Sequence, residues 1–155
     1  MMTLRTELGD FSSIICLKSI ISGMEDALGE KATAIALIAA GRARGKSLAA
    51  ALDLTHRNHS LDQLTALVAE ALGEKGTRLL ILDRIEPTDD GFSVYTRETV
   101  CSAGEALGSQ RCCTFTLGVI QGVLEAITGQ RYHGRHVESV LRGAGADVFE
   151  YQARS

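Results

Sequence analysis

Residues 112–129, CCTFTLGVIQGVLEAITG, constrain the fold most, because this stretch combines a clear helical pattern with almost no charge. At about 3.6 residues per turn, the apolar side chains form a continuous seam and the polar ones gather into a narrow stripe. The seam contains Cys113, Leu117, Ile120, Leu124 and Ile127, and the stripe contains Thr114, Gln121, Glu125 and Thr128. A helix that meets water along one line only is expected to lie in the middle of the fold.

Two glycines interrupt this helical stretch one turn apart, roughly opposite the apolar seam. Inside a helix each glycine costs about 1 kcal/mol relative to alanine, so both positions need a compensating reason. Because they lack a Cβ atom, Gly118 and Gly122 would let another helix or a ligand approach the backbone closely. Of these two interpretations, the pattern favours the packing of a helix.

The length of 155 residues predicts a single domain over residues 1–155, with residues 1–10 as a loosely held arm. A net charge of -3 argues against nucleic-acid binding. The longest apolar stretches, residues 11–21 and 32–40, fall short of the roughly 20 residues that cross a bilayer. Membrane contact would therefore be peripheral at most, or through a covalent lipid.

The four cysteines of the chain bear on its compartment. Cys16, Cys101, Cys112 and Cys113 show no CxxC spacing, and the first residues lack the charged and apolar regions of a secretory signal. We therefore expect a reducing, cytoplasmic compartment. Cys113 lies on the apolar seam, where cysteine usually acts as a small hydrophobe.

Patterns along the rest of the chain predict two further helices, one short helix and two pairs of strands. Residues 11–21 mix β-branched and apolar side chains and suit a short strand or an apolar arm. The other expected elements are a helix over residues 24–52, a helix opened by the capping box of Ser60 and Gln63 and ending near Gly73, strands at 77–85 and 92–97, a short helix within 98–109, and strands at 132–142 and 148–152. The order α-α-β-β-α-β-β predicts an α+β domain with helices packed on a small antiparallel sheet.

No constellation of catalytic or metal-binding residues stands out. Ser102 and Cys101 have no histidine nearby in the sequence, so neither has an evident activating base. The histidines are His56, His59, His133 and His136. Together with the adjacent cysteines they could supply zinc ligands, but the geometry is poor and no metal site is expected. Glu138 is a lone carboxylate among apolar residues, and most such side chains point outward from a strand.

Several short motifs form a series along residues 105–150. They are EALG at residues 105–108, Cys113, Gly118, Gly122, the LEAITG that ends at Gly129, Glu138, and a glycine turn that leads to Val148, Phe149 and Glu150. The series resembles the 4-vinyl reductase domain, also called the hydrocarbon-binding domain, which is related to the core subunits of the TRAPP vesicle-tethering complex. The earlier helix, with ALGEKA and then Gly41 and Gly45, is similar to the first helix of that family. The resemblance points to small single-domain members of cyanobacteria, associated with photosynthesis.

The resemblance implies a homodimer formed through the helices, with an apolar pocket between the first helix and the central helix. It implies a hydrophobic small molecule as the ligand, either a tetrapyrrole-related molecule, an aromatic hydrocarbon or an acyl chain. The residues expected to contact this ligand are Cys112, Cys113, Phe115, Leu117, Gly118, Ile120, Gly122 and Glu138. A TRAPP-like covalent acyl chain would be attached to Cys113 or Cys112, and no other cofactor is expected.

The sequence departs from the family pattern at two positions. Related domains often carry a cysteine three residues after the glutamate and another in the last strand, where this chain has Leu141 and the segment DVFE. A metal or redox role built on those cysteines is therefore not expected. We expect a non-enzymatic binding module that acts as a sensor, carrier or assembly factor. The alternatives are an enzyme or enzyme subunit of tetrapyrrole vinyl reduction, and a structural subunit like those of TRAPP with no free ligand.

Overall fold

The computed structural model describes residues 5–55 and 58–155, so residues 1–4 of the predicted arm and His56 lie outside the described residues. This part of the chain forms four α-helices and a four-stranded sheet. The elements are α1 (Ile14–Leu28), α2 (Glu30–Ala51), α3 (Leu61–Leu72), β1 (Ile81–Thr88), β2 (Gly91–Arg97), α4 (Thr114–Thr128), β3 (Tyr132–Glu138), the 3-10 helix η1 (Val140–Arg142) and β4 (Asp147–Ala153). The predicted α+β class is confirmed, with one helix more than the predicted order contains.

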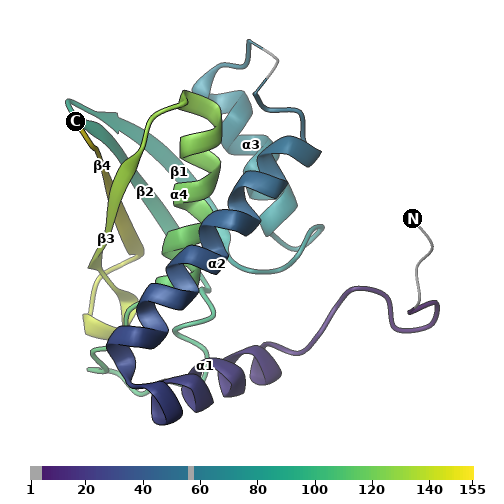
Figure 1. Ribbon diagram of the computed structural model, residues 1–155, viewed down its shortest axis with the longest axis vertical. Coiled ribbons are helices and arrows are strands. Elements are labelled where there is room, and N and C mark those ends of the chain that lie inside the picture. The colour runs from purple at the N-terminus through teal and green to yellow at the C-terminus, as the bar shows by residue number, and fades with distance from the viewer. Residues whose placement is uncertain (1–4, 56–57) are drawn as a thin grey trace.

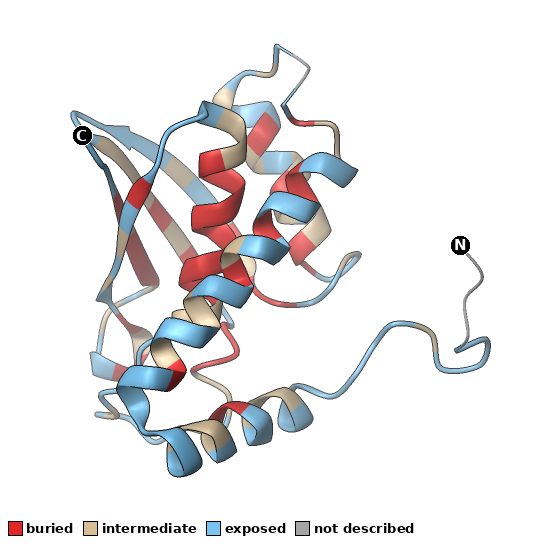
Figure 2. Cartoon of the chain, viewed as in Figure 1, coloured by how far each residue is buried: buried red, intermediate tan, exposed pale blue. Residues whose placement is uncertain are grey.

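Helix α4 occupies the middle of the molecule, between α2 and the sheet (Figure 1). Every residue from Thr116 to Glu125 is buried, as Figure 2 shows along this helix. Helix α3 packs beside β1, and α1 lies at the end of α2 where the chain enters that helix. The described residues before α1 extend away from the body. The prediction that residues 112–129 form the central helix is confirmed.

The sheet has the strand order β1-β2-β4-β3, and every neighbouring pair is antiparallel. β1 and β2 form a hairpin in which Asp89 and Asp90 make the turn. The pairing register of β1 shifts between Leu82 and Arg84, and Pro87 lies near the end of this edge strand. β4 lies inside the sheet and pairs with both β2 and β3, so the last strand of the chain joins the β1–β2 hairpin to β3.

Helices α2 and α4 cross and contact each other through glycines. A Cβ atom added at Gly41 or Gly45 would collide with the backbone of α4, and one added at Gly118 or Gly122 would collide with the backbone of α2. Only glycine permits backbones to approach this closely. The prediction that the two glycines of α4 mark close helix packing is therefore confirmed, and the neighbour that they admit is α2.

Side chains of the sheet close the core on the opposite face of α4. Phe149 and Tyr151 of β4 and Val94 of β2 are almost completely buried. The Tyr151 hydroxyl donates a hydrogen bond of 2.8 Å to the carbonyl oxygen of Leu117. Burial raises the pKa of Tyr151 well above its ordinary value, so the hydroxyl remains a donor and joins α4 to the centre of the sheet.

The N-terminal part differs from the sequence-based expectation in two places. Ile14–Leu28 forms helix α1, so the expectation of a short strand or an apolar arm over residues 11–21 is wrong. The helix predicted over residues 24–52 is wrong as a single element, because Gly29 separates α1 from α2 with φ 84° and ψ 155°. This backbone conformation is accessible to glycine and strained for other residues, so Gly29 defines the turn between the two helices.

The remaining differences concern element ends. α3 begins at the predicted capping box, in which its N-cap Ser60 and Gln63 of its first turn exchange hydrogen bonds of 3.0 and 3.2 Å. β1 begins later than predicted because residues 77–80 bond to the last turn of α3. Residues 98–109 form turns instead of the predicted short helix, and η1 replaces the end of the strand predicted over 132–142. Within the described residues, no helix is both long and apolar enough to cross a membrane.

Candidate functional site

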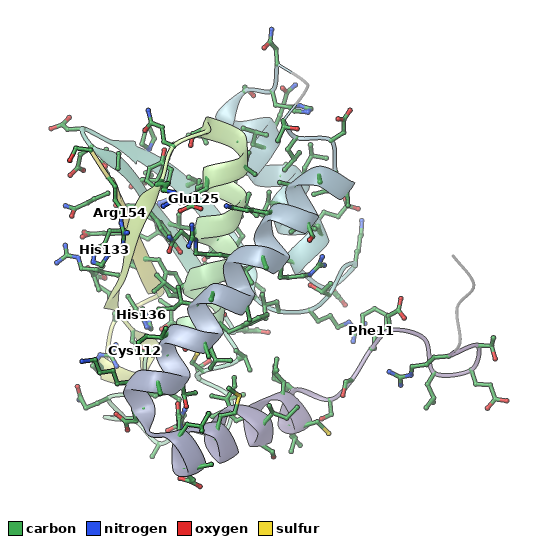
Figure 3. The ribbon with its side chains drawn as sticks, in the orientation of Figure 1. Phe11, Cys112, Glu125, His133, His136 and Arg154 are labelled. Carbon is green, nitrogen blue, oxygen red and sulfur yellow. A yellow bond between two sulfur atoms is a disulfide. The ribbon has the colours of Figure 1, made fainter. Side chains whose placement is uncertain are left out.

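An apolar groove lies between the start of α1 and the segment that follows α3. Its cavity volume is about 690 Å³, and its apolar lining comes from Phe11, Ile14, Leu17, Ile20 and Leu79. Figure 3 shows Phe11 on the segment that leads into α1. Small-molecule sites in proteins are typically concave, largely apolar and roughly 300 to 1,000 Å³ in volume. The groove meets these requirements.

Helix α1 contributes to this groove because much of its apolar surface is left exposed by the described residues. Ser13 caps the helix, and its side-chain oxygen accepts a hydrogen bond of 3.2 Å from the N–H of Ile15. Ile21 is buried, whereas Ile15 and Ile20 are 72% and 59% exposed. Leu8 and Phe11, which precede the helix, are exposed as well. A concentration of exposed apolar side chains of this kind marks a site of interaction.

Arg78 supplies a positive charge to the groove. Its guanidinium carbon lies 5.7 Å from the centre of the Phe11 ring, and its Nε donates a hydrogen bond of 3.2 Å to the carbonyl oxygen of Glu74. Arg78 has φ 54°, a region that costs a non-glycine residue about 1 to 2 kcal/mol. A guanidinium suits the recognition of a carboxylate or another anionic group. The free, exposed thiol of Cys16 also borders the groove.

The middle of the polar stripe of α4, at Gln121 and Glu125, is buried, whereas Thr128 at its end is exposed, so the expectation that the whole stripe meets water is wrong. Glu125, labelled in Figure 3, is 6% exposed, and its carboxylate lies 2.7 Å from the Arg42 guanidinium and 3.4 Å from the Lys46 ammonium. Gln121 and the Tyr132 N–H also donate hydrogen bonds to it. Burial alone would raise the pKa of Glu125, but these donors lower it to about 2. Glu125 therefore connects α4 to α2 through ion pairs and to β3 through a hydrogen bond.

A disulfide joins Cys101 to Cys113 at the start of α4, with the two Cα atoms 5.3 Å apart. The backbone N–H of Cys113 donates a hydrogen bond of 3.2 Å to Nδ1 of His136. Because Nδ1 is the acceptor, the neutral ring carries its proton on Nε2, which lies 3.1 Å from a carboxylate oxygen of Asp147. The side chains of His136 and Asp147 are each 2% exposed. The cluster thus connects the start of α4 to β3 and β4.

Asp147 is held as a carboxylate by several donors. Burial alone would raise its pKa, but hydrogen bonds from His136, Ser139 and Thr99 lower it. The Thr99 hydroxyl lies 3.1 Å from one carboxylate oxygen. A carboxylate that orients a histidine is a frequent feature of catalytic sites, but the acceptor nitrogen of His136 is occupied by a backbone N–H. The arrangement therefore positions the start of α4 and leaves no imidazole nitrogen for a substrate.

A second group of charges fastens α1 to the loop of residues 98–113. Lys18 Nζ lies 2.8 Å from a carboxylate oxygen of Glu105, and Arg111 pairs with Glu105 at 2.6 Å and with Glu25 at 2.7 Å. The hydrogen bond from Lys18, with further help from Arg111, lowers the pKa of Glu105 to about 2. A groove of about 490 Å³ lies at this junction and includes the exposed, free Cys112 in its lining.

The structure does not bring the predicted ligand residues together in one pocket. Leu117 and Ile120 are buried in the core, and Gly118 and Gly122 contact the backbone of α2. A ligand could reach the backbone at Gly118 and Gly122 only if α2 moved. Phe115 is half-buried against the core.

The other predicted residues lie at separate places. Glu138 is exposed near the end of β3, as expected for a strand carboxylate that points outward. Cys113 is fully buried and bonded to Cys101, so an acyl thioester at Cys113 would first require reduction of the disulfide. Cys112 is exposed and free, and acylation there stays a prediction. Figure 3 shows Cys112 and His136 at the same end of α4.

The groove residues were missed because they come from two segments that are distant in the sequence. One signal could have identified half of the groove: Ser13 is a favourable N-cap, and Ile14, Leu17 and Ile21 follow at helical spacing. The β-branched side chains of residues 11–21 obscured this helix. No local pattern connects α1 with residues 77–79.

No protein-family model matches the chain, and no curated protein matches it. Solved structures that share its α+β fold include a sensory domain and a subunit of a trafficking protein complex. One is the phenol-responsive sensory domain of the transcription activator PoxR with phenol, with 12% identity, a TM-score of 0.74, and coverage of 93% of this chain and 76% of that chain. Another is a trafficking protein particle complex subunit 3 from Naegleria fowleri covalently bound to palmitic acid, with 15% identity, a TM-score of 0.60, and coverage of 92% and 93%. At these identities the similarity shows the fold alone.

Proposed function

We propose that this chain is a non-enzymatic binding module that holds a hydrophobic small molecule in the groove between α1 and residues 77–79. The observation that carries the proposal is the groove itself, with its volume of about 690 Å³ and its apolar walls. Arg78 at the groove favours a ligand with one anionic end, such as a fatty acid or a phenolate. Such a module would act as a sensor or carrier.

The ligands of the two similar structures support this chemical class. Phenol and palmitic acid each combine an apolar body with one polar group. The apolar lining and Arg78 together suit a molecule of that kind. A tetrapyrrole ligand and a link to photosynthesis remain predictions from the sequence resemblance, and a cytoplasmic location remains a prediction from the cysteine spacing and the first residues. Vinyl reduction would be tested by turnover of a tetrapyrrole in the presence of a reductant.

A fluorescent fatty acid, cis-parinaric acid, tests whether the groove binds such a ligand. Ile20 lines the groove and is 59% exposed, so Ile20→Gln should fold normally and weaken binding by about fivefold or more through the loss of apolar contact. Ile35→Gln is a matched control, because Ile35 is 65% exposed on α2. Its affinity for the probe should equal that of the unchanged protein.

Equal binding by the two variants would place the ligand elsewhere, and no binding by the unchanged protein would refute the proposal. Native mass spectrometry and an absorbance spectrum of protein purified from its own host would identify a ligand carried through purification. A pigment or an apolar molecule in the organic extract would also decide between the ligand classes.

A second candidate function is that of a structural interaction subunit without a free ligand. The observation in its favour is the exposed apolar surface of the segment before α1 and of α1 itself. A second copy of this chain could cover that surface, which would give the homodimer expected from the sequence resemblance.

Sedimentation equilibrium tests the second candidate. Ile15 is 72% exposed and does not line the groove, so Ile15→Gln should weaken a dimer formed through α1 and leave binding of cis-parinaric acid unchanged. A monomeric protein at all concentrations would exclude this dimer. A dimer that binds no probe would favour the structural subunit over the ligand carrier.

A further inference from the structure

Helix α1, which forms one wall of the groove, is held to the rest of the molecule by a disulfide-bonded loop. Lys18 Nζ lies 3.2 Å from the carbonyl oxygen of Cys101 and 2.8 Å from the Glu105 carboxylate. Arg111, at the end of the same loop, pairs with Glu25 of α1 over 2.7 Å. Every one of these loop residues lies in the segment that the disulfide closes.

Apolar contacts hold α1 to the body only weakly compared with its polar contacts to the loop. Among the residues of α1, Ile21 alone is buried, and the turn at Gly29 is the covalent connection to α2. An element with few buried side chains opens at a low cost in free energy unless other contacts hold it. The position of α1 therefore depends on the polar contacts with the loop.

The loop between β2 and α4 has little regular structure of its own. Its backbone forms turns, with hydrogen bonds such as that from the Ser102 N–H to the Thr99 carbonyl oxygen. The disulfide fixes Cys101 to Cys113, which is fully buried and bonded through its N–H to His136. The covalent bond thus connects the partners of Lys18 to the rigid start of α4.

We infer that the Cys101–Cys113 pair is a redox-sensitive device that sets how firmly α1 is held against the body. A dithiol reductant transfers two electrons and two protons to the pair, its own sulfurs become a disulfide, and Cys101 and Cys113 become thiols. The loop then loses the cross-link that ties Cys101 to the start of α4, and the partners of Lys18 become mobile. Because α1 lines the groove, reduction also loosens the ligand site, a consequence that rests on the proposed function.

Hydrogen–deuterium exchange measured by mass spectrometry tests this inference in the variant Cys16→Ser/Cys112→Ser. Its two remaining cysteines have only each other as partners within the chain. The protein is compared after mild oxidation and after reduction with dithiothreitol. Reduction should accelerate exchange of the α1 amides by about tenfold more than it accelerates exchange in α3, which packs beside β1.

Lys18→Met in the same background tests whether the coupling runs through Lys18. In this variant α1 should exchange rapidly even when the disulfide is formed, so reduction adds less than about threefold. Lys75→Met is the matched control, because Lys75 is exposed and lies in the segment after α3. It should keep the full response to reduction.

Equal acceleration in α1 and α3 would overturn the inference, as would failure of the disulfide to form under mild oxidation. A full redox response in Lys18→Met would also overturn it. Exchange is measured without any ligand, so a negative result leaves the proposed groove function intact. Conversely, a redox-dependent α1 in a protein that binds no probe would refute the proposed function alone.

Discussion

The guanidinium of Arg42 and the carboxylate of Glu125 meet at 2.7 Å in the contact between α2 and α4. The Glu125 side chain is 4% exposed and that of Arg42 is 32% exposed, so the carboxylate is the buried partner. Lys46 adds a second cation one turn further along α2, at 3.4 Å. Removal of the carboxylate would leave the donors around it without an acceptor.

Replacement of Glu125 by Gln should lower the free energy of unfolding at pH 7 by about 3 kcal/mol. This loss corresponds to a Glu125 pKa that falls from 4.5 to about 2 on folding. Because the pKa is lower in the folded chain, the stabilisation is complete above about pH 4.5 and is lost as the pH falls toward 2. Urea unfolding of both proteins between pH 7 and pH 2 should show their stabilities converge. The exposed Glu70→Gln is the control, and a pH-independent difference would contradict this account.

The glycine contact between α2 and α4 predicts that alanine lowers stability at a glycine in the contact and raises it at a helical glycine outside the contact. Gly45→Ala should lower the free energy of unfolding by about 2 to 3 kcal/mol, because its Cβ atom would collide with the α4 backbone. Gly23→Ala is the control in α1, where a Cβ atom meets nothing within 4 Å, and it should raise stability by about 0.5 to 1 kcal/mol. Thermal unfolding measures both, and equal stabilities would show that the helices can separate at low cost.

His136→Phe should destabilise the protein by about 2 to 4 kcal/mol, because it removes the acceptor of the Cys113 N–H and a donor to the buried Asp147 carboxylate. Phenylalanine preserves a ring near Phe149, on which His136 stacks at 4.6 Å, so lost packing does not account for the change. His133→Phe on the exposed side of β3 should change stability by less than about 0.5 kcal/mol. Equal free energies of unfolding for the two variants, measured by chemical denaturation, would exclude a stabilising role for the pair of His136 and Asp147.

Arg78→Met should distinguish how much the charge of a ligand contributes to its affinity from how much its apolar body contributes. We expect a loss of about tenfold in affinity for a fatty acid and little change for the alcohol of the same chain length, because a charge-assisted hydrogen bond is lost in the first case only. Competition against cis-parinaric acid gives both affinities, and the exposed Arg44→Met on α2 is the control. Equal losses for acid and alcohol would show that Arg78 contributes packing alone.

Local patterns predicted the elements that local forces determine. The capping box of Ser60 and Gln63 identified the start of α3, because its two hydrogen bonds depend on neighbouring residues only. The paired glycines of α4 identified a close helix contact, since glycine inside a helix has a cost that packing must offset. The break at Gly29 was missed because a glycine within a helical pattern does not reveal its own dihedral angles.

The candidate site lay beyond such reasoning because its parts meet only in the folded chain. The polar stripe was expected to face water, but cations of another helix neutralise Glu125 inside the protein. The disulfide pairs cysteines 12 positions apart whose approach depends on the loop between β2 and α4. The groove is formed by α1 and residues 77–79, and no sequence pattern in either segment indicates that the two lie in contact.

The two outer strands of the sheet restrict how this domain can associate with other chains. β1 has an irregular register between Leu82 and Arg84 and includes Pro87, which has no N–H to donate to a neighbouring strand. On the opposite side, the pairing of β3 shifts between His136 and Glu138. Irregular edges of this kind oppose the addition of a strand from another molecule. The sheet is therefore protected against edge-to-edge aggregation, and association is directed to the helical side of the protein.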